Sequence, residues 1–136
     1  MEEAKRTRVV AAVIMRGGRY LCMKRGKSRY EYISGRWEFP GGKVDPGEND
    51  REALEREISE EMDWSVTPRE LVGIVDYTYP DFSLRLAAYM CEAPADDSFK
   101  LLEHSEYRWV TADELPELCW TVADAELISR FIAPEE

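Results

Sequence analysis

Three glutamates in the middle of the chain, Glu57, Glu60 and Glu61, are spaced i, i+3 and i+4. On a helix, residues with this spacing share one face, and their Cβ atoms lie about 5–6 Å apart. Carboxylates placed so closely repel one another, but together they suit a hard divalent cation, because Mg²⁺ prefers oxygen ligands. The alternative is a solvated acidic helix face, which is the usual meaning of a run of charge.

The acidic residues of the chain are concentrated around this triplet. The net charge is −10, and nine acidic and two basic residues between positions 45 and 63 account for seven of those negative charges. A surface that binds nucleic acid is normally basic, so direct binding of DNA or RNA is not expected. The local charge therefore predicts either a solvated helix face or a site for cations.

The residues around the triplet predict a helix over Asp50–Met62 that would carry it. Asn49 can cap the first turn, and Glu52 three residues later completes a capping box. The helix would turn an apolar stripe at i, i+4 and i+8 toward the core, formed by Leu54, Ile58 and Met62.

The rest of the chain predicts strands around this helix and a second helix at the end. Apolar and β-branched runs indicate strands, glycine and proline pairs mark turns, and there is no repeat or linker. Regular structure is expected to break at residues 40–42, and residues 26–35 are expected to form a loop. The predicted strands cover residues 8–16, 20–24, 71–79, 84–91 and 107–110, and a capped turn at 111–114 precedes a helix over 122–132. This order predicts an α+β, or mixed α/β, fold in which a mixed sheet packs between helices.

Length and composition limit the class of protein. A chain of 136 residues predicts one domain, residues 1–136, that can bury a core without disulfides. No apolar stretch reaches the roughly 18 residues of a membrane span, and the charged N-terminus lacks the apolar centre of a signal peptide. The scattered cysteines, Cys22, Cys91 and Cys119, predict reduced thiols. We therefore expect a cytoplasmic protein without a membrane partner.

Residues 42–64, GKVDPGENDREALEREISEEMDW, resemble the Nudix box. The box has a glycine, a glutamate six residues later, and an Arg-Glu-aliphatic-x-Glu-Glu core on a helix. The matching positions are Gly42, Glu48, Arg56, Glu57, Ile58, Glu60 and Glu61, and Trp64 fills the closing apolar position. The whole chain resembles MutT-like Nudix hydrolases more weakly. The resemblance implies an α-β-α sandwich with a mixed central sheet.

One position departs from the pattern. The family usually has glycine where this chain has Asp63, and that glycine ends the helix, often in a left-handed conformation. Aspartate tolerates this region better than most residues, at a cost of roughly 1 kcal/mol. Because Asp63 is not a ligand position, we expect a structural variation that leaves the chemistry intact.

The resemblance assigns roles to the residues of the box. It implies that Glu57 and Glu61 are the principal Mg²⁺ ligands, with Glu60 beside them and the carbonyl of Gly41 as a further ligand. Arg56 would orient box carboxylates such as Glu48, which is compatible with an ordinary pair to Glu52 or Glu60. Gly42 would support the site as part of the same loop.

Many relatives use a further carboxylate on a later loop. Glu103, six residues before Trp109, stands at the matching place, and Glu106 is the rival. The neighbouring His104, the only histidine, is expected to be a surface residue rather than a ligand.

The implied reaction is the hydrolysis of a nucleoside triphosphate to a monophosphate and pyrophosphate. Bound Mg²⁺, for which Mn²⁺ is a substitute, would neutralise phosphate oxygens and lower the pKa of a bound water. Glu57, Glu60 or Glu103 could accept the proton of that water. Arg25 and Lys43 could hold phosphate oxygens, or either could be a solvated surface residue.

The box does not define the nucleotide, but the MutT-like branch suggests a base-reading segment. Here Trp120 would stack on the base, and Asp124 would accept from an exocyclic amine, as in cytosine or oxidised guanine. Alternatively Asp124 caps the last helix and Trp120 belongs to the core. Tyr77 and Tyr79 are other candidates for stacking. An 8-oxo-dGTP or (d)CTP-like substrate, and a role in nucleotide-pool sanitation, follow from the first alternative.

Three rival functions remain open at this point. The chain could hydrolyse another diphosphate, such as a nucleotide sugar or dinucleoside polyphosphate. It could be a non-catalytic binding domain of the same fold, although such domains generally lose the box carboxylates. It could also be an acidic interaction protein. A monomer and a homodimer are both compatible with the sequence.

Overall fold

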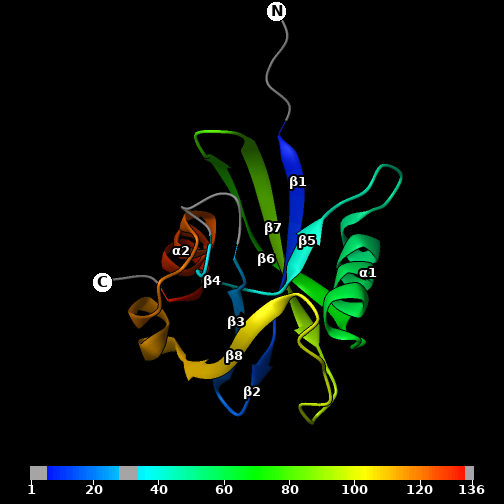
Figure 1. Ribbon diagram of the computed structural model, residues 1–136, viewed down its shortest axis with the longest axis vertical. Helices are drawn as coiled ribbons and strands as arrows, with labels where there is room; N and C mark the ends of the chain where they lie inside the picture. The colour runs from blue at the N-terminus through cyan, green and yellow to red at the C-terminus, as the bar shows by residue number, and fades with distance from the viewer. Residues whose placement is uncertain (1–5, 28–33, 134–136) are drawn as a thin grey trace, which may run out of the picture.

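The computed structural model describes residues 6–27 and 34–133 (Figure 1). Part of the predicted loop, residues 28–33, therefore lies outside the described residues. The strands are β1 (Thr7–Val13), β2 (Met15–Arg16), β3 (Arg19–Arg25), β4 (Trp37–Glu38), β5 (Gly41–Lys43), β6 (Thr67–Thr78), β7 (Ser83–Glu92) and β8 (His104–Thr111). The helical segments are α1 (Asp50–Met62), the 3-10 helix η1 (Ala112–Glu117), α2 (Val122–Leu127) and the π-helical turn η2 (Ile128–Ile132).

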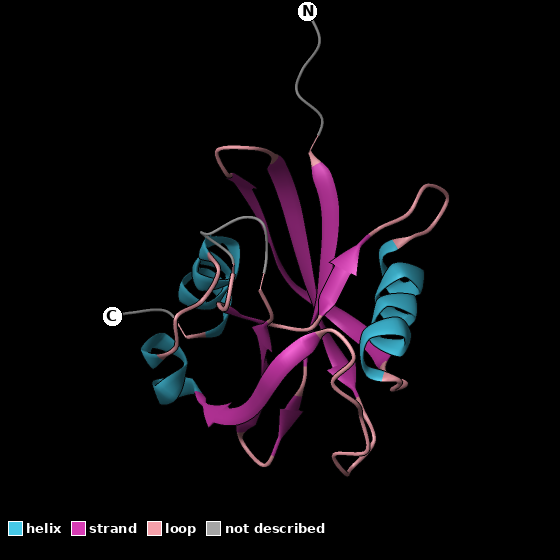
Figure 2. Ribbon diagram, in the orientation of Figure 1, coloured by secondary structure: helices cyan, strands magenta, loops and turns pink. Residues whose placement is uncertain are grey.

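The strands form two sheets. The first has the order β5-β1-β7-β6, in which β1 and β7 are parallel and the other pairs are antiparallel. The second is antiparallel, with β2, β4 and β8 all paired to β3. Helix α1 lies on one side of the strands and α2 on the other (Figure 2). The predicted mixed sheet between helices is confirmed, and a second sheet accompanies it.

Strand β1 contains a continuous apolar run because both of its faces are buried. It lies between β5 and β7, and alternate side chains enter different cores. Val10 and Ala12 pack in the core beneath α1, whereas Ala11 and Val13 pack in the core beneath α2. A strand buried on both faces needs apolar residues at every position.

Helix α1 has the bounds that the sequence predicts. The Asn49 side chain accepts from the Glu52 backbone at 2.8 Å, and Glu52 accepts from the Asn49 backbone at 3.0 Å. The predicted apolar stripe is fully buried and consists of Leu54, Ile58 and Met62. Burying one large apolar side chain stabilises the fold by about 1.5–3 kcal/mol. The helix ends at Asp63, which takes the left-handed conformation (φ 49°) while its N–H donates to the Ser59 carbonyl.

Three expectations about strands were wrong in extent. The run 8–16 divides into β1 and β2. A break was expected at residues 40–42, but residues 41–43 form β5 against β1. Only glycine fits at position 41, because a Cβ there would lie 2.0 Å from the Val10 carbonyl oxygen. Strand β6 begins at Thr67, before Pro68, because β6 is an edge strand and proline is tolerated at edges.

The last predicted helix, over residues 122–132, is interrupted. Regular α-helix ends at Leu127, and the Ala133 N–H reaches the Ile128 carbonyl, five residues back, at 2.8 Å. Such π-helical turns are short and occur inside or at the end of α-helices. Neither α1 nor α2 has the length and apolarity needed to cross a membrane. All three cysteines are free, as expected; Cys22 and Cys91 are buried and Cys119 is exposed.

Candidate active site

A pocket of about 650 Å³ opens between α1 and the segment that leads into α2. Its charged lining residues are Arg25, Glu38, Lys43, Asp45, Glu57, Glu61 and Asp124. Its other walls include Gly41 and Gly42 and the aromatic residues Phe39, Tyr79 and Phe82. Several predicted site residues therefore meet in one cavity, whereas others do not line it, namely Glu48, Arg56, Glu60, Glu103 and Trp120.

The glutamate triplet on α1 divides into two environments. Glu57 and Glu61, at i and i+4, line the pocket. Glu60 does not, and 55% of its side chain is exposed. Gly42 allows the approach of Glu57, because a Cβ on Gly42 would lie 2.3 Å from the Glu57 Oε2 atom.

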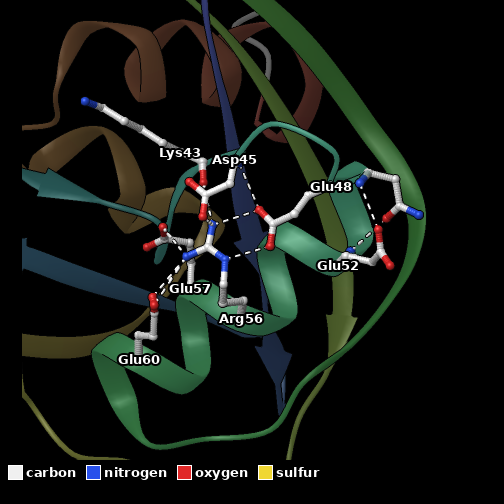
Figure 3. Close-up of polar contacts among 8 residues, drawn as sticks. Lys43, Asp45, Glu48, Glu52, Arg56, Glu57 and Glu60 are labelled. Atoms are coloured by element: carbon white, nitrogen blue, oxygen red, sulfur yellow. Dashed lines mark hydrogen bonds and ion pairs between the residues drawn. The ribbon is translucent and has the colours of Figure 1, made fainter.

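Arg56 is the centre of an ion-pair group that we call the Arg56 cluster, comprising Arg56, Asp45, Glu48, Glu57 and Glu60 (Figure 3). Its guanidinium donates to both Glu48 oxygens, at 2.7 and 2.9 Å, which is the bidentate geometry of a strong pair. Its Nη1 atom lies 3.0 Å from Oε1 of both Glu57 and Glu60. The predicted pairing of Arg56 with Glu48 is confirmed, and this contact lowers the pKa of Glu48. The guanidinium thus fixes the Glu57 carboxylate from the solvent side.

Glu61 lies in an environment that opposes its charge. Its Oε2 atom is buried and has no hydrogen-bond partner among the described residues. Burial, followed by the charges of Glu38, Glu57 and Glu103, raises the pKa of Glu61 to about 9. The charges of three carboxylates act on a fourth, so a cation that enters the site would be favoured there.

The loop before β8 docks on the C-terminal end of α1. The Leu102 N–H donates to the Glu61 carbonyl at 3.1 Å, and the Lys100 N–H donates to the Met62 carbonyl at 2.7 Å. These contacts bring Glu103 close enough for its charge to raise the pKa of Glu61. The rival Glu106 instead pairs with Arg108 at 3.1 Å, so the geometry favours Glu103 over Glu106.

Glu38 in the pocket wall and its partner His104 do not follow the sequence-based expectations. Glu38 lines the pocket and was not singled out from the sequence; its Oε1 accepts from Arg25 at 2.9 Å. The expectation that His104 lies on the surface was wrong, since only 3% of its side chain is exposed. The His104 Nε2 atom lies 3.0 Å from the Glu38 Oε2 atom. Arg25 is thereby held in the pocket, as its proposed contact with phosphate requires.

Asp124 lies in the wall that faces α1 across the pocket. Its Oδ1 accepts from the Phe39 backbone at 3.1 Å, and its Oδ2 accepts from the Thr121 hydroxyl at 2.5 Å. Burial, together with the charge of Glu38, raises the pKa of Asp124 to about 7. The first bond joins α2 to the residue that follows β4, and Asp124 also contributes to the pocket lining.

The two other predicted substrate-binding residues have contrasting positions. Trp120 is in the core, where its Nε1 donates to the Leu115 carbonyl at 2.6 Å and its ring packs 5.0 Å from that of Phe39. Its placement favours the core alternative. Lys43 lines the pocket, is exposed, and extends away from the Arg56 cluster in Figure 3.

The family described as NUDIX domain matches residues 5–131 of this sequence. The chain belongs to the Nudix family. Among proteins similar to it, the CTP pyrophosphohydrolase of Escherichia coli K12 is 32% identical over 141 residues, covering 95% of this chain and 93% of that protein. A Mycobacterium tuberculosis protein, provisionally named 8-oxo-dGTP diphosphatase 2, is 37% identical over 120 residues, covering 85% of this chain and 81% of that one.

Solved structures show the same Nudix architecture. The crystal structure of a MutT protein from Methanosarcina mazei Go1 superposes with a TM-score of 0.83 at 27% identity, covering 96% of each chain. The solution structure of the ORF135 protein of E. coli gives a TM-score of 0.80 at 30% identity, covering 96% of this chain and 91% of that one. The chain is thus a MutT-like Nudix hydrolase, which implies a nucleotide substrate.

Nudix enzymes generally use a divalent metal ion, and the residues of this pocket fit one. Among the described residues, no three His, Cys, Asp or Glu side chains converge closely enough to hold a metal ion on their own. Mg²⁺ does not require such a cage, because it usually takes one or two carboxylates and completes its octahedron with water and phosphate. Glu57 and Glu61 supply two carboxylates, and the unpartnered Glu61 Oε2 atom is a hard oxygen donor.

Proposed function

We propose that this Nudix hydrolase is a nucleoside triphosphate pyrophosphohydrolase that releases a nucleoside monophosphate and pyrophosphate. The observation that carries the proposal is one pocket with Glu57 and Glu61 on one wall and Asp124 with Tyr79 and Phe82 on the facing walls. Such a pocket can hold a charged phosphate chain at one end and a flat base at the other. The names of the E. coli and M. tuberculosis relatives point to the same class of substrate.

We propose Mg²⁺ as the metal, with Mn²⁺ as a substitute. Glu57 and Glu61 are its first ligands, the Gly41 carbonyl is a backbone ligand, and Glu60 and Glu103 complete the candidate set. When bound, the ion supplies charge neutralisation of the phosphates and a bound water of lowered pKa. The exposure of Glu60 and its pairing with Arg56 make it the outermost member of this set.

The protein's own side chains have three tasks in the reaction. Glu57 and Glu61 would hold the metal ion, and the Arg56 cluster keeps Glu57 in place. The proximity of Glu103 to Glu61 supports Glu103 as the carboxylate that accepts the proton of the attacking water, with Glu57 and Glu60 as alternative bases. Arg25 and Lys43, both in the pocket wall, supply positive charge to phosphate oxygens.

The base is read at the Asp124 wall. A carboxylate accepts hydrogen bonds from an exocyclic amine, such as N4 of cytosine or N2 of oxidised guanine. Tyr79 and Phe82, whose rings lie 5.2 Å apart, offer aromatic faces in the pocket, where the buried Trp120 does not. We therefore propose an 8-oxo-dGTP or (d)CTP-like substrate and a role in nucleotide-pool sanitation. The absence of nucleic-acid binding and the choice between monomer and homodimer stay predictions.

Steady-state kinetics with Mg²⁺ test this function on a panel of 8-oxo-dGTP, dGTP, CTP, dCTP, a UDP-sugar, ADP-ribose and a dinucleoside polyphosphate. The expected products are a nucleoside monophosphate and pyrophosphate, with the highest kcat/KM for a triphosphate. Asp124→Asn should change the ratio of kcat/KM between the best two bases by about tenfold, because its acceptor charge is lost. Turnover confined to nucleotide sugars or dinucleoside polyphosphates would overturn the proposal.

A further inference from the structure

We propose that His104 is a positioning residue for substrate binding: its Nε2–H holds Glu38, and Glu38 holds the Arg25 guanidinium in the pocket. The functional part of this inference rests on the proposed function, in which Arg25 contacts the phosphate chain. His104 itself touches neither substrate nor metal. It acts through two hydrogen bonds, one of 3.0 Å between His104 and Glu38 and one of 2.9 Å between Glu38 and Arg25.

The three side chains form a row across three neighbouring strands. Strand β3 lies between β4 and β8, and Arg25 on β3 is directly opposite His104 on β8. Glu38 on β4 is opposite Met23, two residues before Arg25, and is therefore its diagonal neighbour on the same face. Residues in this relation can contact one another, and here they join β8 to the pocket wall.

A β-bulge brings the imidazole into the row. Lys24 is opposite Glu106, but Arg25 is opposite His104, so Ser105 is an extra residue in β8. In an unbroken register Ser105 would be opposite Arg25, and the next side chain would point to the other face of the sheet. Bulges re-aim side chains and are frequent beside active sites.

A histidine at position 104 does not favour the stability of the fold. Its side chain is 3% exposed, and its Nδ1 atom is buried with no hydrogen-bond partner among the described residues. Leaving a buried polar atom without a partner is unfavourable, and an apolar residue of similar volume would avoid it. The contact that His104 does make is to Glu38, which requires a hydrogen on Nε2.

Glu38 matters because Arg25 has other carboxylates nearby. The charges of Glu61 and Asp124 act on Arg25 in addition to that of Glu38. If Glu38 could rotate, the guanidinium could turn toward Glu61 and occupy the space of the metal. With one oxygen bound to Arg25 and the other to His104, the Glu38 carboxylate has one orientation, and Arg25 has one as well.

Two substitutions at position 104 test the inference kinetically on the best triphosphate substrate. His104→Leu removes the donor and should raise KM about tenfold, the lower end of the effect of supporting residues, while kcat stays within about threefold. His104→Gln can still donate from a terminal nitrogen and should restore KM to within about threefold. Ser105→Ala, at the exposed bulge residue next to it, is the matched control and should match the wild type.

A double-variant cycle separates positioning from a general packing defect. In an Arg25→Ala background, His104→Leu should raise KM no further, because the residue it positions is gone. Mg²⁺ affinity measured without nucleotide should be the same in wild type and His104→Leu. Unchanged KM in folded His104→Leu, or an equal further loss in the Arg25→Ala background, would overturn the inference.

The single histidine also permits a test that needs no activity. A long-range ¹H–¹⁵N spectrum of the whole protein contains one imidazole, and it should show the Nε2–H tautomer. Glu38→Gln should shift the Nε2 and Hε2 signals. An Nδ1–H tautomer, or no response to Glu38→Gln, would overturn the contact with Glu38. If no panel substrate is hydrolysed, the proposed function fails while this spectrum still decides the contact.

Discussion

Glu60 and Glu61 are neighbours on α1 and have opposite surroundings. Glu60 is 55% exposed and pairs with Arg56, as part of a cluster in which one guanidinium serves four carboxylates. Glu61 points into the pocket, where its Oε2 atom has no hydrogen-bond partner among the described residues. Of two glutamates one peptide bond apart, one is paired with a guanidinium, and the other lies where burial and neighbouring carboxylates oppose its ionised form.

The contrast explains how a helix with such repulsion remains stable. At the outer side of the Arg56 cluster, the side chains of Asp45 and Glu60 are 60% and 55% exposed, and ion pairs in contact with water contribute little to stability. Glu61 and Asp124 lie in the pocket, where burial and the charge of Glu38 oppose their ionised forms. Binding of a metal ion should therefore stabilise the protein mainly at the pocket.

The largest expected effect separates the two neighbours directly. Glu61→Gln removes the charge of a proposed metal ligand and should lower kcat by about 10²-fold or more, since a metal ion supplies several kcal/mol of transition-state stabilisation, whereas Glu60→Gln should lower it by less than about tenfold. Equal losses in the two variants would refute the distinction between cluster and pocket. The exposed Glu55→Gln on the same helix is the control and should retain wild-type kcat.

The Arg56 cluster should matter next. Arg56→Ala leaves Glu57 without its outer partner and should lower kcat/KM about 10–100-fold, as loss of a group that orients a metal ligand does. Arg56→Lys keeps the charge but cannot bind Glu48 through two nitrogens, so it should recover little of the loss. Full recovery by lysine would indicate that only charge is needed.

The pH dependence of stability should reflect the ionisation of Glu61 in the pocket. The pKa of Glu61 is raised from 4.5 to about 9 on folding, so the folded metal-free protein retains a proton that the unfolded chain releases. The contribution of Glu61 to the stability of the metal-free protein should therefore be fully present below pH 4.5 and be lost as the pH rises through 9. When the pH is raised from 5 to 9, the Tm of Glu61→Gln should fall less than the Tm of the wild type. The difference between the two falls, measured by calorimetry, should be on the order of 5 °C. An identical slope in both proteins would contradict the assigned environment.

A smaller effect concerns the cap of the helix that carries both groups of carboxylates. Asn49→Ala removes the acceptor of the Glu52 N–H and should lower the free energy of unfolding by about 1 kcal/mol. Denaturant titration measures this change, and Asn49→Ser should be close to wild type because serine also caps.

The smallest effect is expected at the other end of α1. Asp63→Gly removes the only non-glycine residue with positive φ in the described chain and should raise the free energy of unfolding by about 0.5 kcal/mol. Its ion pair with Lys100, in which both side chains are more than 60% exposed, should contribute little. A loss of stability in the denaturant titration would mean that this pair outweighs the backbone cost.

Much of this arrangement can be predicted from local patterns. Helix α1, its capping box and its left-handed end follow from residues within a few positions of one another, and the spacing of the box glutamates follows from the helix. The positions of the longer strands were also predictable, but β4, β5 and the start of β6 were not, because they depend on pairing with distant strands.

The parts of the site that could not be predicted arise from long-range geometry. His104 looks like a surface residue because its burial depends on the bulge at Ser105, which leaves no mark in the sequence. Glu38 stands between Trp37 and Phe39, so an alternating pattern places it on the outer face, yet that face borders the pocket. The sequence favours Glu103 but leaves Glu106 as a rival, and the docking of residues 100–102 on α1 distinguishes them.

The direction in which α1 runs has a consequence for the metal. Its N-terminus begins at Asp50, and Glu57 and Glu61 lie in its C-terminal half, where the last turn contains no basic residue. The aligned peptide dipoles place about half a negative charge at that end of a helix. The backbone itself therefore adds to the attraction that a dication feels on entering, and the same three glutamates on a helix of reversed polarity would bind it less tightly.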